Sequence, residues 1–75
     1  MYFIGQKVRF PNPVMLYSKR EKVVFRGMVV KVEYPEKVYV EFPPEYNVHA
    51  YGKNTLCFAA AWCESNGFLV PDDGE

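Results

Sequence analysis

Residues 24–42, "VFRGMVVKVEYPEKVYVEF", constrain the fold of this chain more than any other segment. Two valine-rich runs flank a short turn that contains Pro35, and Gly27 lies within the first run. Valine and aromatic residues favour strands, and proline fixes φ at the second position of a turn. The segment therefore predicts one long β-hairpin that takes up a quarter of a 75-residue chain.

The apolar residues of the first strand change parity along its length. Odd positions are apolar before Gly27 and even positions after it, with Val23 and Phe25 in the first set and Met28, Val30 and Val32 in the second. A change of register at a glycine is typical of a β-bulge or a strong bend. We therefore expect a bend at Gly27, after which Val29, Lys31 and Glu33 face outward.

The return strand alternates regularly, so its two faces can be predicted residue by residue. Val38, Val40 and Phe42 are expected to face the core, and Tyr39 and Glu41 to face outward. A long strand bent at a glycine lets one hairpin contribute to both halves of a small barrel.

The remaining segments supply shorter strands. "IGQKVRF" alternates and predicts a half-buried opening strand, which the prolines of "PNPV" end. Residues 14–22 are predicted as a connection whose apolar start lies under the sheet and whose "SKREK" tip is exposed.

Residues 55–67 allow two interpretations. Asn54 or Thr55 could cap the start of a helix that Gly67 ends. The same letters also fit a strand "TLCF", a helical turn near residues 59–64 and a final strand "GFLV". The segment is too uniformly apolar for an amphipathic surface helix, so we favour the strand–turn–strand interpretation.

Length and composition indicate one domain over residues 1–70 and a flexible tail over residues 71–75. The chain is 49% hydrophobic and 17% aromatic, which suits a small core closed by a few large rings. No apolar run approaches the roughly 20 residues that span a bilayer, and the start of the chain does not read as a signal peptide. We expect a cytoplasmic protein.

The pattern "VRF…FRGMVVKV…KVYVEF…LCF…GFLV" resembles the SH3-like barrels, and especially their Tudor and KOW-type members. The resemblance includes a G-x-x-V strand at 5–8 and G-x-V at 27–29. It implies an all-β, five-stranded SH3-like barrel with a short helical turn before the last strand. The expected core is Val8, Phe10, Phe25, Val30, Val32, Val38, Val40, Phe42, Leu56, Phe58 and Leu69.

The residues that could support catalysis form no recognisable motif. Cys57 and Cys63 have apolar neighbours in the sequence, so we expect both to be buried, reduced and unreactive. Either could pair with the single histidine, His49, in a thiol–imidazole site, but nothing in the spacing demands it. No set of ligands has the spacing of a zinc site, and no glycine-rich phosphate loop is present. We expect neither an enzyme nor a cofactor or metal.

Charge is distributed unevenly although the net charge is zero. Residues 1–31 hold seven basic residues and one acid, and residues 32–75 hold two basic residues and eight acids. The asymmetry can mean a basic and an acidic face, or charges that interleave once the chain folds. If the early elements are neighbours, one basic face suited to phosphates results from Lys7, Arg9, Lys19, Arg20, Lys22, Arg26 and Lys31.

Two kinds of binding module follow as predictions. The first engages nucleic acid, or a protein of a transcription or translation complex, through Lys7, Arg9, Lys19, Arg20, Lys22 and Arg26. KOW-type domains bind RNA or such machinery, so the resemblance implies this partner; a pI near 6.6 argues against strong binding. The second is a protein–protein adaptor, or a host-interfering accessory protein of a phage-like genome, that binds through Tyr39, Tyr46, His49 and Tyr51.

Overall fold

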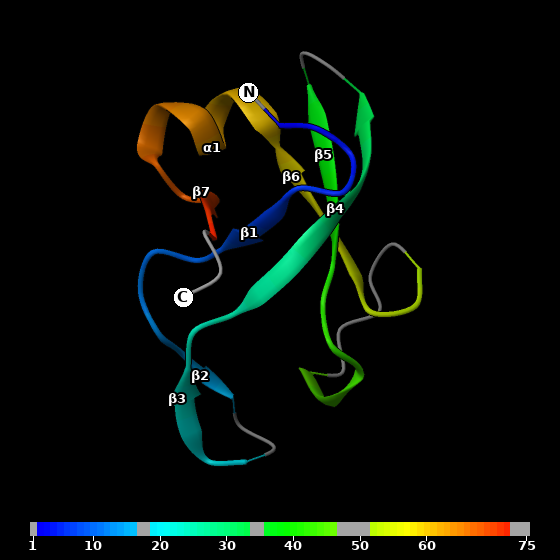
Figure 1. The fold of residues 1–75 in the computed structure, drawn as a ribbon. Coiled ribbons are helices and arrows are strands. Elements are labelled where there is room, and N and C mark those ends of the chain that lie inside the picture. The colour runs from blue at the N-terminus through cyan, green and yellow to red at the C-terminus, as the bar shows by residue number, and fades with distance from the viewer. Residues whose placement is uncertain (1, 17–18, 34–35, 47–51, 73–75) are drawn as a thin grey trace.

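The computed structural model describes residues 2–16, 19–33, 36–46 and 52–72 of the 75-residue chain. This part of the chain is mostly β-structure with one α-helix (Figure 1). In chain order its elements are β1 (Lys7–Arg9), β2 (Val14–Leu16), β3 (Glu21–Val23), β4 (Arg26–Glu33), β5 (Lys37–Glu41), the 3-10 turn η1 (Pro44–Tyr46), β6 (Thr55–Ala59), α1 (Ala60–Asn66) and β7 (Val70–Pro71). The broad prediction of a β protein is confirmed.

Five strands form one antiparallel sheet in the order β6-β5-β4-β1-β7. They correspond to the five strands that the sequence predicts. The sheet is open, because among the described strands β6 pairs with β5 alone and β7 with β1 alone. The predicted closed barrel is therefore wrong at the level of strand pairing. One edge, β7, has only two residues and ends in Pro71, which cannot donate to a further ladder.

A second, two-stranded sheet occupies the segment that the sequence analysis predicts as a connection. β2 and β3 pair antiparallel, with Val14 opposite Val23 and Leu16 opposite Glu21. Leu16 is buried, as expected for the apolar start of this segment, whereas Val14 and Met15 are exposed. The β2–β3 hairpin extends from the lower end of the main sheet, opposite the β4–β5 turn (Figure 1).

The register of β4 changes at Val30, later along the strand than predicted. Val29 pairs with Val40 and Lys31 with Tyr39, so Val30 is the extra residue of a bulge. Val29 is fully buried and Val30 is 38% exposed, the reverse of the predicted orientation. An extra residue in one strand reverses the parity of every position beyond it, which explains why the sequence shows both odd and even apolar sets.

Gly27 permits a close approach between β4 and β5 and does not form the bulge. A Cβ atom at this position would lie 2.7 Å from the carbonyl oxygen of Glu41 and 2.8 Å from Cγ1 of Val40. Both distances are well below the roughly 3.5–4.0 Å of a favourable carbon contact. No other residue fits here unless one of the strands moves.

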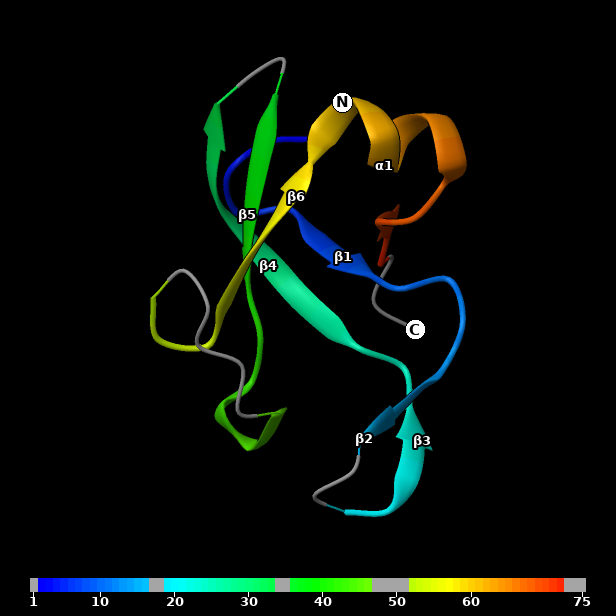
Figure 2. The same ribbon diagram turned by 180° about the vertical axis from the view of Figure 1, so that it is seen from behind.

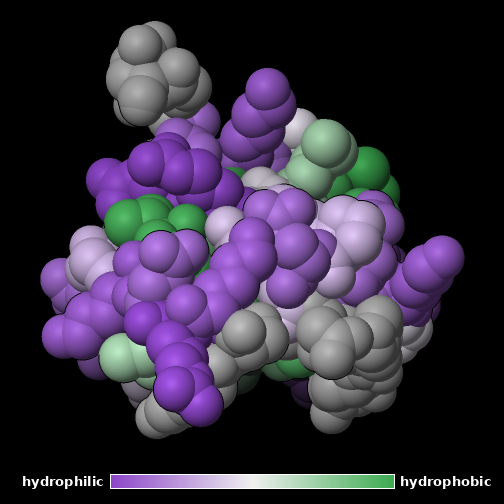
Figure 3. Space-filling view, turned by 90° about the horizontal axis from the view of Figure 1, so that it is seen from below, coloured by the Kyte–Doolittle hydropathy of each residue, from purple (hydrophilic) through white to green (hydrophobic). Residues whose placement is uncertain are grey.

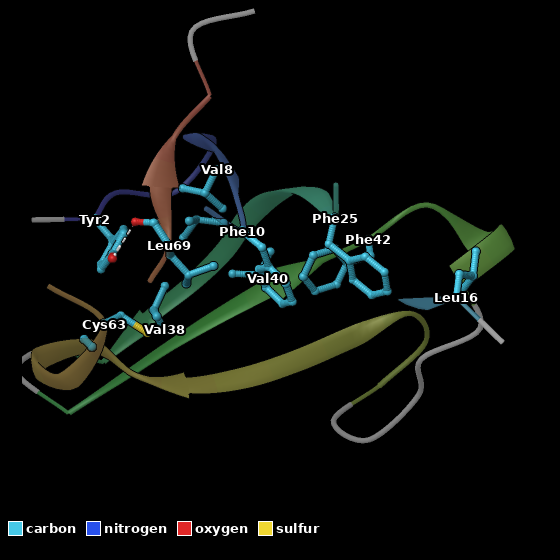
Figure 4. Close-up of a cluster of buried hydrophobic side chains, with 12 residues drawn as sticks. Tyr2, Val8, Phe10, Leu16, Phe25, Val38, Val40, Phe42, Cys63 and Leu69 are labelled. Carbon is cyan, nitrogen blue, oxygen red and sulfur yellow. Dashed lines mark hydrogen bonds between the residues drawn. The ribbon is translucent and has the colours of Figure 1, made fainter. Parts of the chain in front are cut away.

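The core lies on the inner face of the sheet (Figure 4). Three rings at its centre pack together, with Phe10 stacked on Phe25 at 5.3 Å and edge-on to Phe42 at 5.8 Å between centroids. Such pairs add to the stabilisation from burial alone. The buried apolar side chains are Tyr2, Val8, Phe10, Leu16, Phe25, Val29, Val38, Val40, Phe42, Ala60, Cys63 and Leu69.

Most of the predicted core is confirmed. Val32, Leu56 and Phe58 are half-buried and pack against the core, and Val30 is the member that was assigned to the wrong face. Residues buried without having been predicted for this core include Tyr2, Leu16, Val29 and Ala60. The confirmed members are Val8, Phe10, Phe25, Val38, Val40, Phe42 and Leu69.

Residues 55–71 follow the strand–turn–strand prediction, with a helix of seven residues instead of a single turn. Helix α1 continues directly from the end of β6 (Figure 2). Gly67 ends it in the left-handed conformation, φ 62°, and the N–H groups of Gly67 and Phe68 both donate to the Cys63 carbonyl. This is the glycine C-cap that the helical alternative placed at the same residue.

The described part of the chain ends one residue after β7. Pro71 belongs to β7, and the Asp72 N–H donates to the Lys7 carbonyl at 2.8 Å. Residues 73–75 of the predicted tail lie outside the described residues. Within the described ranges, α1 is far too short to cross a bilayer, and no other helix qualifies as a membrane span.

Candidate nucleic-acid interface

Three basic residues lie on the outward face where β1 pairs with β4. Arg9 is directly opposite Arg26, and Lys7 precedes Arg9 by two positions. Val8 between them is fully buried, so the alternation of a strand directs Lys7 and Arg9 to the opposite face. Like charges opposite each other destabilise a sheet, and the Arg9–Arg26 pair is therefore favourable only with a counter-charge nearby.

Asp72 provides a counter-charge from beyond β7. Nη1 of Arg26 donates to both carboxylate oxygens of Asp72, at 3.0 and 3.1 Å. The Asp72 side chain is 13% exposed and that of Arg26 is 50% exposed. Because β1 lies between β7 and β4, the guanidinium reaches across β1 to make this contact. Among the described residues, no carboxylate forms an ion pair with Lys7 or Arg9.

A hollow of about 310 Å³ opens beside this ion pair. Its polar groups are two cations and two carboxylates, and its apolar part comes from β4, Phe42 and Pro43. The residues that line it are Lys7, Arg26, Gly27, Met28, Glu41, Phe42, Pro43 and Asp72. Met28 is 43% exposed and supplies an apolar surface next to the basic groups.

The other three predicted residues lie on the β2–β3 hairpin. Lys19, Arg20 and Lys22 are all exposed, and Arg20 has a left-handed backbone with φ 54°. The turn is closed by the Lys19 N–H, which donates to the Leu16 carbonyl at 3.0 Å. The end of the molecule that carries this hairpin is covered mostly by hydrophilic residues with small apolar patches between them (Figure 3).

The two groups of basic residues are joined through the chain between β3 and β4. Lys22 and Arg26 are exposed, whereas Val23 is half-buried and Phe25 is buried. The basic side chains therefore stay on the outward side as the chain passes from the hairpin to the main sheet. Lys7, Arg9 and Arg26 thus share the outward surface of the β1–β4 pair. Lys19, Arg20 and Lys22 lie on the hairpin that directly precedes β4 in the sequence.

Lys31, the seventh basic residue of the first half, is engaged elsewhere. Its Nζ lies 3.0 Å from Oε2 of Glu33 and 5.3 Å from the centre of the Tyr39 ring. The hydrogen bond and charge of Glu33 raise the pKa of Lys31, and the same contact with Lys31 lowers the pKa of Glu33. Desolvation and then the Glu33 charge raise the pKa of Tyr39, whose hydroxyl donates to Glu33 at 3.5 Å.

The tyrosines of the alternative prediction do not share one environment. Tyr39 is half-buried on the outward face of β5 and interacts with Lys31 and Glu33. Tyr46 packs into the core instead, stacked on Phe25 with centroids 4.4 Å apart and its hydroxyl directed to the Val24 carbonyl. His49 and Tyr51 lie outside the described residues.

The two cysteines are free thiols with different exposure. Cys63 is fully buried, and burial followed by the charge of Glu64 raises the pKa of its thiol. Cys57 is only half-buried on β6, so the prediction that both are buried is wrong for this residue. No cluster of three or more His, Cys, Asp or Glu side chains suited to a metal ion occurs in the ranges that the structure describes.

Sequence reasoning missed two features of this surface. The contact of Asp72 with Arg26 joins residues 46 positions apart, and no local pattern signals it. The β2–β3 hairpin has a weak signal, because the apolar letters at 14–16 and the Val23–Val24 pair flank the basic tip.

Trp62 on α1 is 55% exposed, and its ring lies 5.5 Å from that of Phe68, although the sequence around it is apolar.

Comparison with protein-family models, with curated proteins and with solved structures found no match to this chain. The fold and the surface described above define the class of this protein. It is a small, mostly β protein with an open five-stranded sheet, and basic side chains gather on the outward face of β1, on β4 and on a projecting hairpin.

Proposed function

We propose that this protein is a non-catalytic binding module that contacts the phosphates of a nucleic acid. The contact surface comprises Lys7, Arg9 and Arg26 on the β1–β4 pair and Lys19, Arg20 and Lys22 on the β2–β3 hairpin. The observation that carries the proposal is the β1–β4 register, which sets Arg9 against Arg26 with Lys7 beside them. Asp72 offsets the cost of these like charges at Arg26, whereas Lys7 and Arg9 form no ion pair with a described carboxylate and remain available to an anionic ligand.

The exposure of the hairpin supports the same function. Lys19, Arg20 and Lys22 are exposed on a hairpin that extends beyond the end of the main sheet (Figure 1), so their long side chains can reach a phosphate backbone at this end of the molecule. The hollow beside Lys7 and Arg26 adds an apolar surface at Met28, against which the flat part of a nucleotide can rest. Lysine and arginine contacts to phosphates carry most of the affinity and little of the sequence preference.

The strand order gives some support to the finer fold proposal, an SH3-like arrangement. The order β7-β1-β4-β5-β6 places the first strand between the last strand and a meander of three, with a helix directly before the last strand. We propose that the open sheet has the strand order of an SH3-like arrangement, into which the β2–β3 hairpin is inserted between β1 and β4.

The protein–protein adaptor of the alternative prediction has less support. Tyr46 contributes its ring to the core, and Tyr39 already holds Lys31 and Glu33. Binding hot spots are typically aromatic side chains that are free to enter a pocket of the partner. Neither of these two tyrosines is free in that sense.

Salt dependence tests the nucleic-acid function directly. The protein is titrated into labelled RNA and DNA of mixed sequence, and the binding constant is measured over a range of salt. On duplex DNA the slope of log K against log salt is about −0.9 for each phosphate contacted, and on single strands about −0.7. We expect the slope of the wild-type protein to correspond to several phosphate contacts.

A charge-removing variant locates the surface. The substitutions Lys19→Gln, Arg20→Gln and Lys22→Gln together should reduce the slope and weaken binding to all sequences alike. The matched control is Lys37→Gln, which removes one exposed positive charge at the opposite, β4–β5 end of the molecule. No binding at low salt, or equal losses per charge in both variants, would refute the proposed surface.

A further inference from the structure

The free edge of β6 is suited to pairing with another strand. β6 pairs with β5 on one side, and no described strand pairs with it on the other. Exposed edges are usually protected by charged residues, proline or a bulge. The five residues of β6, "TLCFA", include no charge and no proline, and their pairing with β5 is regular. The opposite edge, β7, is protected by its short length and by Pro71.

The hydrogen-bond pattern shows which backbone groups of β6 point outward. The Phe42 N–H donates to the Asn54 carbonyl, and the Ala60 N–H donates to the Glu36 carbonyl, at the two ends of the β5–β6 ladder. In an antiparallel ladder, hydrogen-bonded pairs alternate with non-bonded ones. The register therefore makes Leu56 and Phe58 the residues bonded to β5, and Thr55, Cys57 and Ala59 direct their backbone groups to the free edge.

Two of these outward groups are already engaged within the chain. The Thr55 N–H donates to the Gly52 carbonyl at 3.3 Å. Ala59 is the N-cap of α1, so its carbonyl accepts the first bond of the helix. Within the described residues, the Cys57 N–H and carbonyl, the Ala59 N–H and the Thr55 carbonyl have no backbone partner.

This set of groups is complementary to itself. If a second β6 pairs antiparallel with the first about Cys57, Cys57 and the partner's Cys57 exchange backbone hydrogen bonds. At each end of the pair, an Ala59 N–H meets a Thr55 carbonyl of the other copy. The pairing uses the groups that lack partners and requires none of those already bonded.

The side chains favour the same register. Symmetric pairing about Cys57 sets Leu56 opposite the partner's Phe58 on the inner face, and apolar cross-strand pairs stabilise a sheet. Both residues face the core yet are only half-buried in the single chain. The pairing brings no like charges together, because β6 has none.

We propose that β6 is a homodimer interface, at which two copies of this chain join their sheets antiparallel about Cys57. A twofold axis of this kind presents the same patch of both copies to each other. The partner at this edge is a second copy of the chain, because the unpaired backbone groups and the apolar side chains of β6 complement those of another β6.

Sedimentation equilibrium of the full chain under reducing conditions tests the proposal. We expect a species of twice 8.7 kDa that dissociates on dilution. Ala59→Pro removes the outward N–H while keeping the backbone, since the φ of −76° at Ala59 suits proline and the N–H bonds none of the described residues. Cys57→Lys sets two positive charges opposite each other. Each variant should weaken the dimer about tenfold or more.

Oxidative cross-linking tests the register. Residues in a hydrogen-bonded antiparallel pair have Cα atoms about 5.5 Å apart, within the roughly 4.4–6.8 Å range of disulfides. A mild oxidant should therefore link the wild-type chains through Cys57. The matched control combines Thr55→Cys with Cys57→Ser and so keeps one cysteine on the edge. In the proposed register, the two cysteines at position 55 lie about 13 Å apart along the strands, too far for a disulfide. This variant should remain unlinked.

Several results would overturn the dimer. One is a folded monomer at concentrations up to about 1 mM, where even weak association is visible. A dimer that both Ala59→Pro and Cys57→Lys leave intact would place the interface elsewhere. Equal cross-linking through residues 55 and 57 would reject the symmetric register. Circular dichroism of each variant separates loss of the dimer from loss of the fold.

Discussion

Val30 is the extra residue of the bulge in β4, and its position decides which valines of β4 enter the core. The bulge lets Val29 face Val40 on the inner side and still returns Val32 to that side two positions after Val30. Without it, a regular strand would place Val29 and Val32 on opposite faces. The side chain at a bulge is the one for which alternation gives no prediction.

Two alanine substitutions separate the buried and exposed valines of the bulge. Val29→Ala removes apolar groups from a fully buried position and should lower the free energy of unfolding by about 1–3 kcal/mol. Val30→Ala should change it by about 0.5 kcal/mol or less, because Val30 is exposed. Urea unfolding of both variants measures the difference. A larger loss for Val30→Ala would mean that the bulge lies elsewhere.

The two thiols should react at different rates. Cys57 is half-buried, whereas Cys63 is fully buried with a raised pKa that lowers its thiolate fraction. We expect a thiol reagent at neutral pH to label Cys57 first and Cys63 only as the protein unfolds. Mass spectrometry after short exposures assigns the label, and Cys57→Ser serves as the control. Prompt labelling of Cys63 would contradict its burial.

At the scale of elements, the β4–β5 hairpin combines a buried face with an ion cluster on its outer face. Val38 and Val40 face the core, and Lys31, Glu33 and Tyr39 lie together on the other side. Neighbouring outward positions on paired strands bring these side chains within reach of one another. The inner face supplies the stability of the hairpin, and the outer cluster makes part of it dependent on pH.

The ion cluster should stabilise the fold only at pH values between the folded-state pKa of Glu33 and that of Lys31. The pKa of Glu33 is lowered from 4.5 by Lys31, so its contribution is complete above pH 4.5 and is lost as pH falls through the lower folded value. The pKa of Lys31 is raised from 10.5 by Glu33, so its contribution is complete below pH 10.5 and is lost as pH rises through the higher folded value.

Thermal unfolding of Glu33→Gln measures this contribution. The variant should have a slightly lower Tm than the wild type near neutral pH, and the difference should vanish in strong acid and in high salt, because the pair is exposed. Glu36→Gln, which removes an exposed carboxylate from the same hairpin, should show no such convergence. A difference that persists in strong acid would mean that Glu33 acts through packing.

An element could be predicted where the apolar–polar alternation within a single strand is regular. "KVYVEF" alternates without interruption, and each of its assignments to the inner or outer face is confirmed. Gly67 ends α1 because a left-handed residue after a helix is a local requirement. The β2–β3 hairpin escaped prediction because β2, "VML", is wholly apolar and β3, "EKV", begins with two charged residues, so neither strand alternates.

At the scale of the whole molecule, contacts between distant segments join the two ends of the described chain. The Tyr2 hydroxyl donates to the Leu69 carbonyl at 2.8 Å in the core, and Asp72 binds Arg26 across β1. The first contact is visible in Figure 4 between the N-terminal segment and the chain before β7. These contacts stabilise the edge of the sheet where β7 is too short to do so alone.

Removal of the Tyr2 hydroxyl should destabilise the whole fold. Tyr2→Phe leaves the Leu69 carbonyl without its buried donor and should lower the free energy of unfolding by about 1–2 kcal/mol. Phe3→Ala, at a neighbouring residue that is 62% exposed, should have an effect of about 0.5 kcal/mol or less. Chemical denaturation compares them. Equal effects would show that the hydrogen bond contributes nothing.

Part of the candidate site also depends on the whole molecule. The sequence identifies which residues are basic and that Lys7 and Arg9 share a face of one strand. It does not identify that Arg9 lies opposite Arg26, because pairing between strands depends on the register of the whole sheet. It likewise offers Tyr46 as a partner-binding residue, whereas the ring of Tyr46 completes the Phe25 and Phe42 cluster.

By itself, the sequence determined what depends on neighbours along the chain. These features are the five strands of the main sheet, the β4–β5 hairpin, most of the core and the glycine at the end of α1. The tertiary structure alone decided the open edge at β6, the position of the bulge, the Asp72–Arg26 contact and the half-exposure of Cys57. The reason is physical: alternation and capping act over a few residues, whereas sheet order and edges follow from contacts between segments far apart in the chain.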